Sequence, residues 1–196
     1  MPKIVNHEEQ RRLVAEAALR VIQHSGLEEA TVRKVAKEAG LSAGSMRHYF
    51  STQAELYIFC MNLIAERVEE RLKALPYEGS LLSDLKELLL QLLPIDEERI
   101  LEMEVWFVFQ SKMLAYPELK TVSSAIQNGL YKASLFVLEE LEKNKRLRPG
   151  LTIEFEAEKL YALIDGLAIH RMLHPNQLSV ERMDELLESH LLSLCS

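Results

Sequence analysis

The fold is decided by residues 31–50, TVRKVAKEAGLSAGSMRHYF. Thr31 can cap a short helix, and Gly40 permits the left-handed backbone that ends a helix. Ser42 can cap a second helix directly after the turn, which gives a helix-turn-helix pattern. Ala36 is small where two crossing helices must approach each other. The apolar residues expected to pack the two helices together are Val32, Val35, Ala36, Ala39, Leu41, Met46, Tyr49 and Phe50.

The charge of this segment favours a nucleic-acid partner over a plain helical hairpin. Residues 31–53 contain four basic residues against Glu38 alone, a local excess of +3. The whole chain carries −7, but residues 1–50 hold eight Lys or Arg against six Glu, a net +2. The remainder holds 15 basic against 24 acidic residues, a net −9. A mildly basic head therefore precedes an acidic body, and local charge governs docking on a polyanion.

A helix of this size fits the major groove of DNA, where base pairs present distinct donor and acceptor patterns. Arginine can donate a fork to guanine, and small residues let the backbone approach the bases. Hydroxyls and helix-terminal amides suit phosphates, which fix register without reading sequence. The expected base-reading residues are Arg33, Ala43, Gly44, Ser45, Arg47 and His48, and the expected phosphate contacts are Thr31, Ser42, Tyr49, Thr52 and Gln53.

Residues 8–56 resemble the DNA-binding head of the TetR family of bacterial one-component regulators. The resemblance rests on a first helix running into Gly26, on the segment 31–50 and on Leu56. One departure is Gln53, because the family commonly has a phosphate-binding lysine there. The resemblance therefore implies weaker electrostatic anchoring of DNA at the start of the fourth helix.

The rest of the 196-residue chain has apolar residues at helical spacing, interrupted mainly by prolines. These patterns predict an all-α fold with about nine helices and no sheet. The expected helices are residues 7–25, 31–39, 42–49, 52–75, 80–93, 95–115, 117–145, 152–173 and 179–195. The expected domains are a three-helix head (1–52), a linking helix (53–75) and a ligand-binding and dimerisation domain (76–196).

The body resembles the C-terminal domain of BetI-type regulators, on residues 104–109, 164–170 and Pro175. A single helix-turn-helix buries little DNA, so such modules usually act as dimers. The resemblance implies a four-helix bundle across a two-fold axis, although the same apolar stripes also suit the body's own core. The expected dimer residues are Leu160, Leu163, Ile164, Gly166, Leu167, Met183, Leu186, Leu187, His190, Leu191 and Leu194.

Aromatic and methionine side chains with sparse polar groups suggest a pocket for a small-molecule effector in the body. The same residues at helical spacing also suit a simple core. The expected lining is Met61, Met103, Trp106, Phe107, Gln110, Met113, Tyr131, Ser134 and Tyr161. The BetI resemblance, to choline-responsive repressors, implies a cationic ligand caged by Trp106 and Tyr131 beside Glu102 or Glu104.

Other classes of protein find no support in the sequence. No apolar run reaches the roughly 20 residues of a membrane span, and no secretory signal begins the chain, so we expect a cytoplasmic protein without a membrane partner. Cys60 and Cys195 are expected to be packing residues, and His170 and His174 a structural pair rather than metal ligands. No catalytic motif or cofactor-binding loop occurs. Three hypotheses remain: a ligand-released repressor of a palindromic operator, a helical enzyme, and a protein-interaction adaptor.

Overall fold

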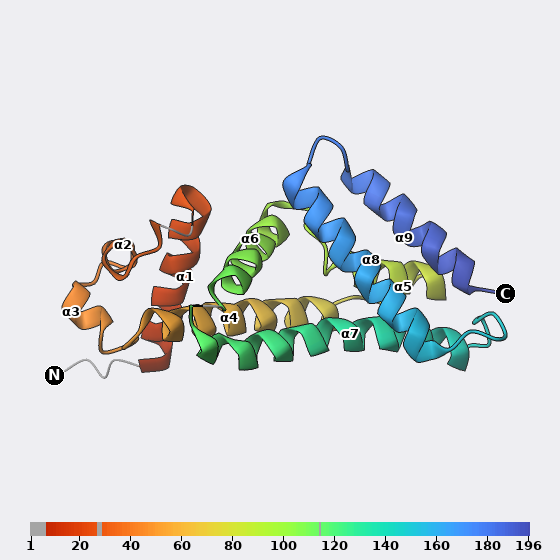
Figure 1. Cartoon of the computed structure of the whole chain (residues 1–196), viewed down its shortest axis with the longest axis horizontal. Helices are drawn as coiled ribbons and strands as arrows, with labels where there is room; N and C mark the ends of the chain where they lie inside the picture. The colour runs from red at the N-terminus through yellow and green to blue at the C-terminus, as the bar shows by residue number, and fades with distance from the viewer. Residues whose placement is uncertain (1–6, 27–28, 114) are drawn as a thin grey trace. The chain divides into compact units, whose positions relative to one another are not determined.

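The computed structural model describes residues 7–26, 29–113 and 115–196, and the regular structure within them is helical (Figure 1). The 3-10 helix η2 (Pro117–Leu119) precedes α7, and Leu147 and Cys195 form an isolated antiparallel bridge. No described residue lies in a β-strand, which confirms the all-α prediction. The α-helices are α1 (His7–Ser25), α2 (Val32–Glu38), α3 (Ala43–Met46), α4 (Gln53–Lys73), α5 (Leu81–Leu90), α6 (Glu97–Lys112), α7 (Lys120–Lys143), α8 (Ile153–Leu173) and α9 (Val180–Leu194).

Two predicted helices differ from the structure in their hydrogen bonding. The expected helix over 42–49 is α-helical only to Met46, and then tightens into turns. The His48 amide donates to the Ser45 carbonyl at 3.1 Å and the Tyr49 amide to the Met46 carbonyl at 2.9 Å. The expected helix over 117–145 begins instead as the 3-10 turn η2, with Pro117 in its first turn. Proline supplies no amide hydrogen, so it is tolerated at such a start.

The chain forms two compact units, and α4, α6 and α7 each continue from one into the other. Unit 1 contains residues 1–67 and 104–123, and unit 2 contains residues 68–103 and 124–196. The predicted domains are consecutive stretches of the chain. In the structure, the second half of α6 and η2 belong to the same unit as the N-terminal head. There the Tyr116 ring meets the Tyr57 ring edge-on, with 6.3 Å between centroids.

Unit 1 is built around the apolar side of α1, which packs against α2. Alanines at positions 15, 17 and 18 of α1 are buried and bring the helices close together. Met46 of α3 is fully buried, and Phe50 is nearly so. The core of unit 1 therefore holds α3 by its inner side and leaves the outer side in solvent.

Unit 2 has its own leucine-rich core, to which α5, α7, α8 and α9 all contribute. α5 and α9 lie against each other, and Lys86 of α5 reaches across to Asp184 and Glu188 of α9 at 2.9 Å each. α8 and α9 are joined by a short loop and run in opposite directions, as the blue part of Figure 1 shows. These contacts fix α8 and α9, the two helices on which the predicted dimer residues lie.

Candidate nucleic-acid interface

The turn between α2 and α3 is fixed by backbone geometry and by two caps. Thr31 accepts a hydrogen bond from the Lys34 amide at 3.3 Å, which caps α2 as predicted. Gly40 has φ +69°, the left-handed conformation expected at this position. Its amide donates to the Lys37 carbonyl at 3.2 Å, and the Leu41 amide donates to Ala36 at 2.8 Å. This pair of bonds is a Schellman motif, so α2 ends abruptly and the chain turns into α3.

α3 begins at the predicted cap. Ser42 accepts from the Ser45 amide at 3.0 Å, and the two serine hydroxyls share a hydrogen bond of 2.8 Å. The Ser45 hydroxyl is therefore already engaged within the turn, and its side chain is half-buried. Met46 points into the core of unit 1, so the opposite side of α3 faces outward.

The outward side carries most of the residues expected to read bases. Arg33, Ala43, Gly44, Arg47 and His48 are all exposed. Short side chains stand at the start of α3 and long polar ones follow at its end. This order lets the backbone approach a groove floor while Arg47 and His48 reach along it.

The surface around α3 keeps its net positive charge when its ion pairs are taken into account. Glu38, the acidic residue of α2, is bound by Arg20 of α1 at 2.8 Å. Lys34 is paired with Glu29. Arg33 and Arg47 form no ion pair with any residue in the described ranges and remain exposed. The face thus presents two unneutralised guanidinium groups, which suits a phosphate-lined groove.

The residues expected at phosphates lie around this face and have partners of their own. Thr31, Ser42 and Thr52 use an oxygen to accept a capping bond. This leaves the hydroxyl hydrogens of Thr31 and Thr52 able to donate to a phosphate, whereas the Ser42 hydroxyl also bonds the Ser45 hydroxyl. Gln53 donates from Nε2 to the Ala30 carbonyl at 3.0 Å and so ties the start of α4 to the residue before the α2 cap. Tyr49 is half-buried.

A cluster that sequence reasoning missed lies behind the interface, where α1 meets the start of α4. The Arg11 guanidinium lies over the rings of Phe50 and Phe59, with its central carbon 4.9 and 4.8 Å from their centroids. It also lies 3.4 Å from Oε1 of Glu55. The Ser51 amide and hydroxyl both donate to Oε2 of Glu55 at 2.9 Å, and the amide bond is the main cause of a lowered Glu55 pKa. Position 11 belongs to no motif, so only the structure identifies it.

The residues expected to line an effector pocket are divided between the two units, and the pocket itself stays a prediction. Met61 is buried, Ser134 is fully buried and bonded to its own helix, and the others are half-buried. Trp106 stacks on Phe109 with 6.2 Å between ring centroids. Unit 1 contains Met61, Trp106, Phe107, Gln110 and Met113, and unit 2 contains Met103, Tyr131, Ser134 and Tyr161.

Glu102, one of the acidic residues expected in a cation cage, already forms an ion pair with another residue. Glu102 is 92% buried as a side chain, and both its oxygens accept from Arg71, at 3.0 and 2.8 Å. Its charge therefore has a partner within unit 2. Glu104 is exposed. Of the two acidic residues considered for the cage, Glu104 is the one that is not paired with Arg71.

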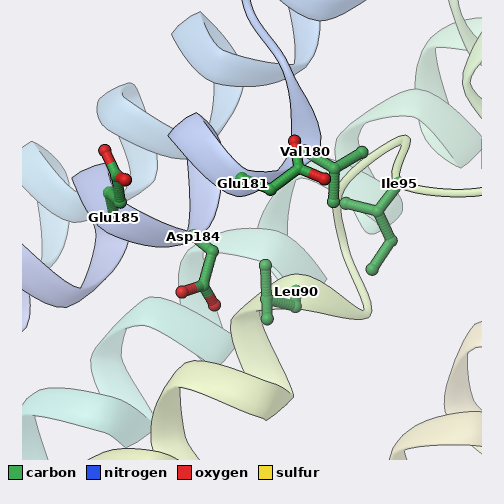
Figure 2. Close-up of a pocket in the computed structure, with 6 residues that line it drawn as sticks. All are labelled: Leu90, Ile95, Val180, Glu181, Asp184 and Glu185. Carbon is green, nitrogen blue, oxygen red and sulfur yellow. The ribbon is translucent and has the colours of Figure 1, made fainter.

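A hollow of about 390 Å³ in unit 2 lies where α9 begins beside the end of α5, and none of the expected pocket residues lines it (Figure 2). Val180 and Ile95 form its apolar side. Among its carboxylates, Asp184 is paired with Lys86 and Glu185 with Arg182 at 2.7 Å. Glu181, the third carboxylate, forms no ion pair with a described residue, so the hollow keeps one uncompensated negative charge. Across the described ranges, no group of three or more His, Cys, Asp or Glu side chains is arranged to hold a metal ion.

Most of the residues expected at a dimer interface are buried within this chain. Seven of the eleven have at most 5% of their surface exposed: Leu160, Ile164, Leu167, Met183, Leu187, Leu191 and Leu194. They pack in the core of unit 2 within this chain, and their place at a dimer interface stays a prediction. Leu163, Gly166, Leu186 and His190 are half-buried. Periodicity found the apolar stripes but not the side of each helix that stays open.

Comparison with known proteins identifies the two parts of the chain. The family model described as "Bacterial regulatory proteins, tetR family" matches residues 14–58, and the model "BetI-type transcriptional repressor, C-terminal" matches residues 82–196. The chain belongs to the TetR family. The match at 14–58 contains α2, the turn and α3, and the match at 82–196 contains the α8–α9 pair.

Relatives and solved structures agree with this TetR assignment. The chain is 41% identical over 197 residues to the HTH-type transcriptional regulator PksA of Bacillus subtilis, covering all of this chain and 94% of that protein. It is 27% identical to the regulator BetI of Stenotrophomonas maltophilia, over 93% and 91% of the two chains. A transcriptional regulator from Rhodococcus sp. Rha1 has a TM-score of 0.80 at 29% identity, over 94% and 95% of the chains.

A regulator from Saccharomonospora viridis, solved in complex with choline, has the same fold, with a TM-score of 0.83 at 22% identity over 93% and 95% of the chains. The family matches and the relatives show that this TetR protein is a transcriptional regulator with a helix-turn-helix DNA-binding domain. Its family and relatives are regulators, not enzymes. In the described ranges, no helix is long and apolar enough to span a membrane.

Proposed function

We propose that this TetR protein is a dimeric repressor that inserts α3 into the major groove of a palindromic operator and is released by a small-molecule effector. The observation that carries the proposal is the outward face of α3. It combines exposed Arg47 and His48 with small residues at its start, while Glu38 nearby is neutralised by Arg20. Such a face suits base edges flanked by phosphates better than it suits another protein surface.

The role of each residue on this face follows from how exposed its side chain is and from whether it is already hydrogen-bonded within the chain. Arg47 is exposed and has no ion pair in the described residues, so it can donate two parallel bonds to a guanine. Ser45 is the weakest of the expected readers, because its hydroxyl already bonds Ser42. Thr31 and Thr52 lie at helix starts, where hydroxyl and amide donors suit phosphate oxygens.

Dimerisation is supported by a second apolar stripe on α8. Phe155, Ala162, Gly166, Ile169 and Leu173 are spaced by seven, four, three and four residues, which places them on one side of a helix. Phe155, Ile169 and Leu173 are 59%, 42% and 64% exposed, and a Cβ added at Gly166 would meet nothing within 4 Å. The residues of α8 that pack in the core lie on the opposite side. A helix that is apolar on both sides needs a second partner, and a second copy of α8 and α9 is the partner we propose.

Release by an effector is supported by the BetI-type family match and by the choline bound to the Saccharomonospora viridis protein. An effector acts only through different affinities for two states of the dimer. α4 is the element that we propose to carry the change, because its first turn borders the DNA-binding face and its last turn lies in unit 2. Choline is the first probe for the effector.

Selection from randomised duplexes, followed by binding measurements, tests the proposal. Arg47→Ala is expected to relax discrimination at one base pair by about 1–3 kcal/mol, whereas Tyr49→Phe should weaken all duplexes alike. Arg148→Ala, an exposed arginine of unit 2, is the control for lost charge. Wild-type protein that stays monomeric and selects no duplex at low salt would overturn the proposal. Capture of a protein partner without DNA would then favour the adaptor hypothesis.

A further inference from the structure

We infer that Arg11 is a positioning residue for the DNA-reading segment: it sets the orientation of α3 without touching DNA. The inference rests on the proposed docking of α3. It starts from the contacts of the Arg11 guanidinium, which are all made within unit 1. The helix-turn-helix segment 31–50 does not include this residue, and its contacts differ in kind from those of an ordinary surface arginine.

The charge of Arg11 is directed inward. Its guanidinium lies over Phe50 and Phe59, whose rings meet edge to face at 5.4 Å between centroids. Nη2 is 3.4 Å from Glu55, and a quarter of the Arg11 side chain is exposed. Nε is buried and has no hydrogen-bond partner among the described residues, so the ring faces are its neighbours. A guanidinium held in this way is neutralised by Glu55 and has little left to offer a phosphate.

The contacts reach the DNA-reading segment through two consecutive residues. Phe50 directly follows the stretch that contains Arg47 and His48, and its ring is one wall of the Arg11 site. Ser51 comes next, and its amide and hydroxyl are both held by Glu55. Arg11 therefore fixes the end of the segment, while the buried Met46 fixes its middle. Planar guanidinium geometry is needed here, because one group must stack on a ring and face a carboxylate at once.

The neighbouring Arg12 provides a matched control. It is on the same helix, carries the same charge and lies beside Arg11 in sequence. Its side chain is 54% exposed and its nearest carboxylate, on Glu66, is 3.8 Å away. A general effect of positive charge on DNA binding would appear in both variants, whereas a positioning effect appears at Arg11 alone.

The experiment compares Arg11→Met, Arg11→Lys and Arg12→Met. The probes are a duplex that wild-type protein selects from a randomised pool and a scrambled duplex of equal length. The measured quantities are the ratio of the two affinities and the slope of log K against log salt on the scrambled duplex. We expect Arg11→Met to lower the ratio about tenfold, the loss of roughly one base contact. Arg11→Lys should also lower it, because lysine keeps the charge without the planar fork.

Each outcome distinguishes the positioning role of Arg11 from one other explanation. A purely structural role lowers the folded fraction and both affinities together, so an unchanged ratio in Arg11→Met would overturn the inference. A phosphate contact would reduce the salt slope by about 0.9 and would also overturn it. Arg12→Met should leave the ratio within about twofold of wild type, which is less than the loss of one base contact. If Arg11→Met does not fold, Arg11→Lys and Glu55→Gln give the same test. Failure of wild-type protein to select any duplex would overturn the proposed function itself.

Discussion

Removing one partner of the buried Arg71–Glu102 pair should destabilise unit 2 strongly. Arg71 is on the last turn of α4 and Glu102 is on α6, and two parallel bonds of 3.0 and 2.8 Å join them. Arg71 also donates to the Gln91 carbonyl at 3.3 Å. The hydrogen bond to Glu102 raises the Arg71 pKa, so the guanidinium stays charged. Arg71→Met would leave Glu102 buried and alone.

The size of the loss follows from the exposure of the two side chains, 19% for Arg71 and 8% for Glu102. Breaking a buried pair in this way costs about 3–5 kcal/mol. A free glutamic acid titrates near pH 4.3, so neutralising one at pH 7 costs about 4 kcal/mol, which limits the charge penalty. We therefore expect Arg71→Met to lose about 3–4 kcal/mol at pH 7.

The assay must report on the unfolding of unit 2. The fluorescence of Trp106 would not do so, because Trp106 lies in unit 1. Hydrogen exchange of amides in α5 and α8, followed against urea, measures the opening free energy of that core. The control is Arg182→Met, which breaks an Arg–Glu pair whose side chains are both 61% exposed and should cost at most about 1 kcal/mol. A loss in Arg71→Met no larger than in this control would refute the reasoning.

Further predictions concern the turn, a half-buried histidine and the start of α4. Gly40→Ala should destabilise unit 1 by about 1 kcal/mol because of its positive φ, while Gly129→Ala, in open space on α7, should be slightly stabilising in the same urea titration. Burial lowers the His190 pKa, so folded protein favours the neutral ring and stability should fall as pH drops below 6.5; His190→Gln should flatten this part of the pH profile of the free energy of unfolding. Gln53→Lys adds a cation where α4 begins, and the salt slope of duplex binding should steepen by about 0.9 per chain.

The local structure of the head followed closely from the sequence. The caps at Thr31 and Ser42 and the left-handed Gly40 were all predicted, because each depends on residues within a few positions of itself. The Arg11 cluster was not, because it joins positions separated by about 40 residues and has no periodic signal. The extent of α3 was overestimated for a different reason. An apolar pattern does not distinguish an α-turn from the tighter turns that follow Met46.

The proposed dimer surface shows why periodicity alone cannot locate a binding face. α8 has one apolar stripe containing Leu160 and Ile164 and another containing Phe155 and Ile169, on opposite sides of the helix. Both stripes have helical spacing, so the sequence predicts that both sides of α8 are buried. It does not predict which of the two sides packs in the core of this chain. Only the packing of α8 within unit 2 decides this, because it buries the first stripe and leaves the second exposed. A charge placed at Ile169 would therefore oppose assembly without disturbing this core.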